Sequence, residues 1–346
     1  MSDAAASKYK NYLMIFGALL AIWGILGWID VGNLAQGGWA EDGNNSVTQV
    51  LPGSPTEAAG LQVGDHIISV GGIARTDAEG AARRGRPDVG ETREFVVERD
   101  GATTSVNVTF GELVPQRKLL AHASFVVGFC FLVFTLRAYM QKQTEATMAL
   151  AVTGTFFSLA FLNGPYFDNY TVRSLDNALT TIIIFLGLAA LLHFLLIFPN
   201  RSAYLDKANA KRMLYAPGLL VGLFLAYRIL VTPEATSALN TTTTVFVGLV
   251  VAFYLVSCLV TVYKSYSGSS AAERDSQGLN LILIGTLAGL ILPLVAIILS
   301  ILAPQAVLPA QSFYFLTFVL IPITWSMAAL KGGDSGQATE TYSADE

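Results

Sequence analysis

Three histidines, His66, His122 and His193, give the sequence its clearest opportunity for metal or acid–base chemistry. A zinc protease site on a helix needs two histidines one turn apart, with a glutamate between them as general base. The residues that follow His193, at positions 194–197, are all apolar, so both the glutamate and the second histidine are absent. We therefore predict no metal site, no cofactor and no metalloprotease activity.

A serine hydrolase acting within a membrane would need a buried serine on one helix and a histidine on a facing helix. Ser158, Ser257 and Ser300 lie in apolar segments, and His193 is the natural base for them. None of these serines stands in a Gly-x-Ser-Gly context, and hydroxyls in apolar helices commonly bond a carbonyl or a neighbouring helix. We assign no catalytic residue, and an intramembrane hydrolase or lipid-handling enzyme using His193 is the alternative function.

His193 and Arg228 are ionisable residues inside apolar segments, and such residues are functional candidates by default. A histidine at position 193 can sense a proton or a ligand, or it can stay neutral and bond a neighbouring helix. Arg228 can extend towards the membrane surface or pair with Asp168 or Asp176, both expected in the outer loop. Both are therefore predicted to be sensing or structural residues of the membrane region.

The composition is that of a membrane protein. Of the 346 residues, 53% are hydrophobic and 13% are charged, and the mean hydropathy is +0.53. An average soluble domain carries about 25% charged residues. The net charge of −4 leaves no basic surface for a nucleic acid, so we predict no nucleic-acid partner. Cys130 and Cys258 are too few for a disulfide framework or a thiolate cluster.

Eight apolar segments come close to the roughly 20 residues that a helix needs to cross a bilayer. They are residues 12–29, 119–136, 146–162, 179–198, 213–231, 245–263, 279–302 and 313–330. The segments are continuous rather than alternating, which favours helices over membrane strands. The predicted fold class is a polytopic α-helical membrane protein with eight transmembrane helices and a small extracytoplasmic α/β domain.

Lysine and arginine residues are concentrated in alternate connections, and cytoplasmic loops carry the excess of these residues. The predicted cytoplasmic set is Lys8, Lys10, Arg137, Lys142, Arg201, Lys207, Lys211, Arg212, Lys264, Arg274 and Lys331. Both termini are then cytoplasmic, and the segment between the first two spans is extracytoplasmic. Residues 33–35 fit a signal-peptidase site poorly, so the first span is predicted to be an uncleaved anchor.

The segment between the first two spans differs from the rest of the chain in composition. Residues 38–113 hold 12 acidic and 6 basic residues, whereas the remainder of the chain is slightly basic. Alternating stretches at 47–50, 67–70, 93–99 and 104–109 predict strands, with a hairpin turn at Asp100-Gly101. The predicted organisation is a cytoplasmic N-terminus and first span (1–36), this domain (37–113), a seven-helix membrane domain (114–331) and a disordered acidic cytoplasmic tail (332–346).

The run VTQVLPGSPTEAAGLQVGDHIISVGG, residues 47–72, combines turn-forming glycines and prolines with core aliphatics. It closely resembles the bacterial, protease-associated type of PDZ domain. The matching residues are Val50, Gly53, Ser54, Pro55, Ala59, Gly60, Leu61, Gly64, Asp65, Ile67, Val70 and Gly72. The resemblance implies a domain that binds extended peptides or protein C-termini by strand addition beside a helix.

In that family the ligand carboxylate rests on backbone N–H groups of a glycine-bearing loop, here the loop before the first strand. Residues 76–84 would form the flanking helix, although they include no large aliphatic residue to line a groove. Arginines in that stretch could attract an acidic partner. The peptide-binding candidates are therefore Gly37, Gly38, Trp39, Arg83 and Arg84.

His193, Phe194 and Phe198-Pro199 close the fourth predicted span just before a cytoplasmic loop. The segments 273–277 and 318–328 follow in an order and spacing that carry a second resemblance. Together they resemble the seven-span sensor region at the N-terminus of some bacterial histidine kinases and serine phosphatases. The resemblance implies a multi-pass protein of the bacterial cytoplasmic (inner) membrane.

In those kinases the last helix continues into an ATP-binding region, whereas a short acidic tail follows here, so we expect the sensor without its output domain. Gly285 and Gly289 form a Gly-x-x-x-Gly face that a partner helix or a neighbouring span could use. The leading prediction is a non-enzymatic protein whose PDZ-like domain docks a protein partner or chain end. Its seven-helix block would contact lipids and sense a ligand, or stabilise a membrane complex as an accessory subunit. A solute transporter is the third alternative.

Overall fold

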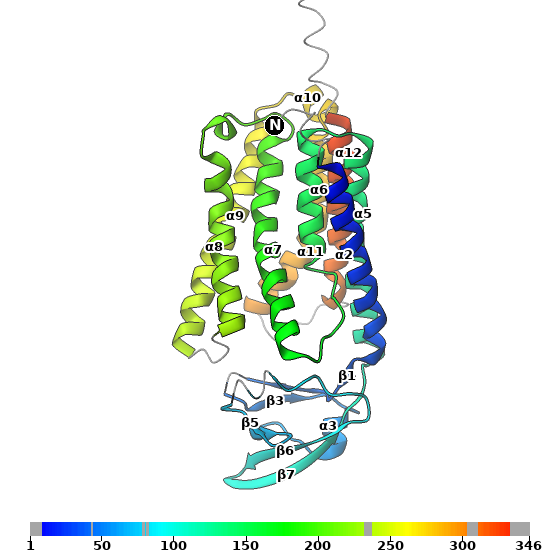
Figure 1. Cartoon of the computed structure of the whole chain (residues 1–346), viewed down its shortest axis with the longest axis vertical. Helices are drawn as coiled ribbons and strands as arrows, with labels where there is room; N and C mark the ends of the chain where they lie inside the picture. Colours follow the sequence, from blue (N-terminus) through cyan, green and yellow to red (C-terminus); the bar gives the residue numbers. More distant parts are fainter. Residues whose placement is uncertain are drawn as a thin grey trace, which may run out of the picture.

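A computed structural model describes residues 9–42, 44–77, 80, 83–231, 237–302 and 311–332. These residues form two parts along the long axis of the molecule, a bundle of helices and a smaller β domain at one end of it (Figure 1). Residues 333–346, which make up nearly all of the predicted tail, lie outside the described residues.

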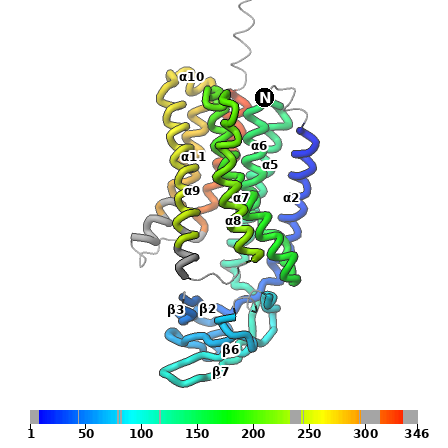
Figure 2. Tube along the Cα trace, turned by 60° about the vertical axis from the view of Figure 1, so that its left-hand side comes forward, coloured from blue at the N-terminus to red at the C-terminus, as the bar shows by residue number. Residues whose placement is uncertain are grey.

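The bundle is built from helices that run along the long axis of the molecule (Figure 2). Its α-helices are α2 (Lys10–Asp30), α5 (Pro115–Gln141), α6 (Glu145–Ser158), α7 (Tyr170–Ile197), α8 (Ala210–Val231), α9 (Ser237–Ser267), α10 (Ala271–Ser276), α11 (Leu279–Leu302) and α12 (Leu320–Gly332). Its 3₁₀ segments are η1 (Val31–Asn33), η2 (Ala203–Asp206) and η3 (Gln311–Val319). Each of the first seven predicted spans overlaps one of these helices, and the eighth overlaps both η3 and α12.

Six helices in the described part of the chain are long and apolar enough to cross a membrane. They are Lys10–Asn33, Arg117–Gln141, Tyr170–Ile197, Ala210–Val231, Val245–Ser267 and Phe313–Gly332. Helix α6 has only 14 residues, and Leu279–Pro293 is a shorter apolar helix. The helices indicate a membrane protein, while the count of eight spans stays a prediction.

Two helix boundaries differ from the predicted ones. Helix α7 begins at Tyr170, well before position 179, because Asn169 Oδ1 accepts a hydrogen bond from Val172 N (3.1 Å) and caps the first turn. The last predicted span opens as the 3₁₀ helix η3, and α-helical geometry starts only at Leu320. Sequence hydropathy locates the apolar part of a helix, whereas capping decides where the helix starts.

Glycines bring α2 into close contact with the rest of the bundle. Gly17, Gly24 and Gly27 are buried on one face of this helix. A Cβ on Gly24 would stand 2.9 Å from Leu162, and a Cβ on Gly27 would collide with the carbonyl of Asn163. Small residues allow helix backbones to approach closely in a membrane. The first apolar helix is therefore packed as part of the bundle.

The Gly-x-x-x-Gly face of α11 is covered by the same chain. A Cβ on Gly285 would collide with Thr324 of α12, and a Cβ on Gly289 would stand 2.7 Å from Ile321. Thr317 of η3 also donates its hydroxyl to Gly289 O (2.7 Å). Of the two predicted uses of Gly285 and Gly289, the structure shows packing against a neighbouring span rather than against a partner helix, because η3 and α12 already occupy this face.

The β domain contains short sheets around one apolar core. Its elements are β1 (Ala35–Gln36), β2 (Trp39–Glu41), β3 (Val47–Val50), α3 (Pro55–Ala59), β4 (His66–Val70), β5 (Ile73–Ala74), β6 (Thr92–Arg99), β7 (Ala102–Thr109) and β8 (Gly111–Glu112). The sheets have the orders β5-β4-β6-β7, β2-β3 and β1-β8. Ile67, Phe95, Val97 and Val108 are fully buried between them.

The predicted strands and hairpin of this domain are confirmed. Asp100 and Gly101 both have positive φ (50° and 78°), as the tight turn between β6 and β7 requires. Gly60 ends α3 with a φ of 88°. The pairing of Ala35 with Glu112 brings the two ends of the domain side by side where the chain leaves and re-enters the bundle.

Candidate functional site

The open edge of β2 is the feature of the β domain best suited to binding an extended peptide. In the described sheets β2 has one neighbour, β3, with Trp39 opposite Val50. On that side Leu51 N donates to Gly38 O (2.8 Å). Because successive backbone groups of a strand point to opposite edges, the N–H and C=O of Trp39 point to the other edge. An edge of this kind can accept a further strand.

Two glycines form the turn that leads into β2, and both are needed there. Gly38 has a φ of 95°, and a Cβ on it would collide with Ser54. A Cβ on Gly37 would collide with the ring of Trp39. Thr56 donates from both its N and its Oγ1 to Gly37 O (3.0 Å each), which fixes the turn against α3. The predicted loop is thus a rigid turn, and its binding of a carboxylate stays a prediction.

The side chain of Trp39 belongs to the core of the domain. Its ring centroid lies 5.1 Å from that of Phe95 and 6.1 Å from that of Phe110, both in edge-on contacts. Trp39 therefore offers a ligand its backbone rather than its ring. At the far end of β2, Glu41 forms an ion pair with Arg75, which ties this strand to the segment after β5.

The predicted helix 76–84, which would flank the peptide, falls partly outside the described residues. Gly80 and Arg83 are helical. Asp77 Oδ1 accepts a hydrogen bond from Gly80 N (2.7 Å), as a residue that caps a helix start does. The contacts of positions 78–79 and 81–82 lie outside the description.

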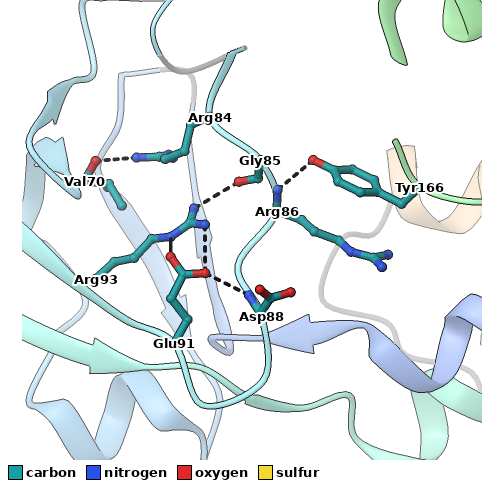
Figure 3. A network of polar contacts seen from close by, with 8 residues as sticks. All are labelled: Val70, Arg84, Gly85, Arg86, Asp88, Glu91, Arg93 and Tyr166. Atoms are coloured by element: carbon teal, nitrogen blue, oxygen red, sulfur yellow. Dashed lines mark hydrogen bonds and ion pairs between the residues drawn. The ribbon is translucent and has the colours of Figure 1, made fainter. Parts of the chain in front are cut away.

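The described contacts of Arg83 and Arg84 are with the bundle and the sheet. Arg84 donates to Val70 O at the end of β4 (Figure 3), and burial lowers the pKa of its guanidinium. Arg83 lies 5.9 Å from the ring centroid of Tyr170, the first residue of α7. The structure therefore does not bring these arginines together with the glycine turn through any contact that it describes.

Tyr166, in the connection between α6 and α7, joins the β domain to the bundle. Its hydroxyl accepts hydrogen bonds from Arg86 N (2.6 Å) and from Arg173 Nη1 (2.9 Å). Its N–H donates to Asp30 Oδ2 (3.2 Å), and Arg86 Nη2 forms an ion pair with Asp30 Oδ1 (2.7 Å). The guanidinium carbon atoms of Arg86 and Arg173 lie 4.4 Å and 5.1 Å from the ring centroid of Tyr166. We call Asp30, Arg86, Tyr166 and Arg173 the Tyr166 junction.

Sequence reasoning missed the Tyr166 junction. Its members come from the last turn of α2, the segment before β6, the α6–α7 connection and the first turn of α7. No short motif contains them, so spacing along the chain could not have found the junction. An arginine-rich stretch in the domain and tyrosines in the facing loop were the only signals.

A second ion pair shapes the segment of the domain that carries Arg86. Arg93 binds both carboxylate oxygens of Glu91 (2.5 Å and 3.2 Å) and donates to Gly85 O (3.2 Å). Glu91 also accepts a hydrogen bond from Asp88 N (2.9 Å; Figure 3). The hydrogen bonds from Arg93 hold the pKa of Glu91 below its usual value. This network fixes the loop so that Arg86 reaches the bundle.

His193 lies in α7 near the end of the bundle opposite the β domain. Its Nδ1 is 3.1 Å from Tyr215 Oη of α8, and the two rings meet edge-on at 5.7 Å. Its Nε2 is buried and has no hydrogen-bond partner among the described residues. Glu145, at the start of α6, is paired with Arg201 and with Lys211 (3.5 Å) at this end. That carboxylate raises the pKa of Arg201.

Arg228 and Ser158, two other polar residues predicted for the membrane region, have partners within it. Arg228 Nη1 donates to Thr243 Oγ1 of α9 (2.7 Å). Ser158 Oγ donates to Thr155 O in its own helix (2.7 Å), so its described hydrogen bond is not with His193. Within the described ranges, no group of three or more His, Cys, Asp or Glu side chains is placed to hold a metal ion.

Residues 46–99 match the PDZ domain family. This range runs from the bridge before β3 to the end of β6, so the predicted resemblance to PDZ domains is confirmed. No curated protein and no solved structure matches the chain. The chain therefore carries a PDZ domain, a module that binds protein partners or peptide C-termini, next to apolar helices that indicate a membrane protein.

Proposed function

We propose that this protein is a non-enzymatic membrane adaptor whose PDZ domain docks a protein partner or a chain end. The ligand would add a strand to the open edge of β2, with its terminal carboxylate at the glycine turn. The observation that carries the proposal is the Tyr166 junction, which ties the PDZ domain to α2 and α7. A partner bound to the domain is thereby held at a fixed place on the membrane region, as an accessory subunit or anchor requires.

The proposed topology has eight spans in a bacterial cytoplasmic membrane, with residues 37–113 outside and both termini inside. In its support, three ion-paired basic residues lie at the end of the bundle opposite the PDZ domain, the end at which Figure 1 shows α10. Arg201 and Lys211 pair with Glu145 there, and Lys331 pairs with Asp275 (3.1 Å). An excess of basic residues marks the cytoplasmic side.

The helices of residues 114–331 are proposed to act as a sensing or anchoring block, like the seven-span region that the sequence resembles. His193 supports a sensing role, because one ring nitrogen has a partner in α8 and the other is buried without one among the described residues. The second candidate, an intramembrane hydrolase or lipid-handling enzyme, rests on the same nitrogen. Turnover of a lipid or peptide substrate that His193→Gln abolishes would favour the enzyme.

Photo-cross-linking from the open edge tests the docking role. A photoreactive amino acid placed at Ala40 in β2, which is exposed, should capture a partner in membranes. The same amino acid at Thr103 in β7, also exposed, is the matched control and should not capture that partner. Gly38→Val should abolish capture from Ala40, whereas Gly53→Ala, at a second positive-φ glycine with open space around it, should retain it. Equal capture from both sites, or capture that survives Gly38→Val, would contradict the proposal.

A further inference from the structure

A groove opens between α2 and the first half of α7, near the end of the bundle that carries the PDZ domain. Its volume is about 370 Å³, within the range of small-molecule sites. We call it the α2–α7 groove, and its defining residues are Leu20, Trp23, Leu159, Phe167, Asp176 and Ile183.

The residues that line the groove are apolar, except for two that lie next to each other on α7. Asp176 and Thr180, one turn apart on α7, are the two polar residues among those that line it. The structure describes no ion pair between the Asp176 carboxylate and a lysine or arginine. Arg173, the nearest basic residue along α7, donates to Tyr166 and to Phe167 O (2.8 Å) in the Tyr166 junction. The Asp176 carboxylate is therefore half-buried in an apolar groove, while the described hydrogen bonds of Arg173 are made within the Tyr166 junction.

The groove has a defined direction relative to the membrane. Asp176 lies six residues into α7, about 9 Å from its start at 1.5 Å per residue. Trp23 lies seven residues before Asp30, so the Trp23 ring and the carboxylate are at similar heights. Ile183 lies about 10 Å deeper than Asp176. Trp23 and Phe167, with ring centroids 5.5 Å apart, stand at the shallow end, where aromatic side chains are enriched in membrane proteins.

We propose that the α2–α7 groove binds an amphiphile with a protonated amine, whose ammonium pairs with Asp176 and whose alkyl chain extends along Leu20, Leu159 and Ile183. A carboxylate removed from water is costly unless a cation and hydrogen-bond donors accompany it. The Thr180 hydroxyl already hydrogen-bonds the Asp176 carboxylate. An ammonium would supply the cation and further donors, and the apolar lining accepts the chain. The face of Trp23 adds an aromatic surface that attracts a cation. The site is distinct from the PDZ docking role, which would stand if the groove bound nothing.

Three probes with the same alkyl chain test the charge requirement: dodecylamine, dodecanol and dodecanoic acid. The full-length protein in nanodiscs should bind dodecylamine about tenfold more tightly than dodecanol, since a charge-assisted hydrogen bond contributes more than one factor of ten. Dodecanoic acid should bind more weakly than dodecanol, because its carboxylate faces Asp176. Equal binding of the three probes would overturn the proposal.

Variants locate the site. Asp176→Asn should reduce the preference for the amine over the alcohol to about twofold, whereas Asp168→Asn, in the exposed loop before α7, should keep it. Val172→Trp, which fills the shallow end from an exposed position, should weaken both amine and alcohol. An amine preference unchanged in Asp176→Asn would overturn the proposal. If Asp176→Asn failed to fold, the amine preference of the native protein and the weaker binding by Val172→Trp would still test the proposal.

Discussion

The hydroxyl of Tyr254 in α9 is inserted into the backbone hydrogen-bond ladder of α8 at Gly218. It accepts a hydrogen bond from Gly218 N (2.9 Å) and donates one to Leu214 O (2.7 Å), two groups that would bond each other in a regular helix. Pro217 lies beside them inside α8. Tyr254 is fully buried, although many apolar residues of α9 are exposed. One side chain therefore both completes the ladder of α8 and fastens α9 to it.

Tyr254→Phe should destabilise the helical bundle. Removal of the hydroxyl leaves an N–H and a C=O of α8 without their partner in a water-poor environment, at a cost of about 1–3 kcal/mol. Thermal unfolding in detergent should show a lower Tm than for the native protein. Tyr263→Phe, at a residue of α9 that is 72% exposed, is the matched control and should leave the Tm unchanged. Equal Tm values for the two variants would contradict this role.

Tyr166→Phe should loosen the PDZ domain from the bundle without unfolding either part. The variant keeps the ring beside Arg86 and Arg173 but loses the oxygen that accepts a hydrogen bond from each. Spin labels on Thr103 and on exposed Tyr263 should report a broader distance distribution. Tyr170→Phe keeps the aromatic ring near Arg83 and should preserve the native distribution. An unchanged distribution in Tyr166→Phe would show that these bonds do not position the domain.

Acid should weaken the PDZ domain through Asp65. Its carboxylate is 1% exposed, accepts two hydrogen bonds from Arg99 (2.6 Å and 2.7 Å) and one from Gln62 N (2.8 Å). The bonds from Arg99 hold the pKa of Asp65 below its ordinary 3.8. Because the folded pKa is lowered, this stabilisation is complete well above that ordinary value, which the unfolded chain has, and is lost as the pH falls through the folded pKa.

Hydrogen exchange of β4 and β6 in the full-length protein checks this prediction. Protection should be constant between about pH 7 and 5 once the intrinsic exchange rate is corrected for, and it should fall below about pH 4. Asp65→Asn should already be destabilised at neutral pH, by about 1–3 kcal/mol, and should lose the acid-dependent step. If Asp65→Asn lost protection in acid by as much as the native protein does, other carboxylates would be responsible for the acid sensitivity of the domain.

Gly38→Ala should destabilise the PDZ domain more than Gly53→Ala. Both glycines have positive φ (95° and 72°), so both substitutions strain the backbone by about 1 kcal/mol. Only at Gly38 would the new Cβ also collide, with Ser54 at the start of α3, whereas the space around Gly53 is open. Hydrogen exchange of β3 and α3 measures the difference. Equal effects would mean that Ser54 moves aside freely.

Local chemistry in the sequence was sufficient for the elements of the PDZ domain. Residues 47–50 and 67–70 alternate between faces, and Asp100-Gly101 has the turn chemistry of a tight hairpin. Apolar runs likewise located the helices of the bundle. The start of α7 was misplaced because the cap at Asn169 precedes polar residues that hydropathy does not count as part of a span.

The amino-acid sequence by itself determined the two parts of this protein, apolar helices and a PDZ domain, because periodicity and turn chemistry act between residues close in the chain. Tertiary structure alone decided that Arg86 meets Asp30 and Tyr166, that Gly285 faces Thr324, and that Asp176 lines a groove opposite Trp23. Those relationships join segments far apart in sequence. Their partners are set by how helices and sheets pack, which no local pattern encodes.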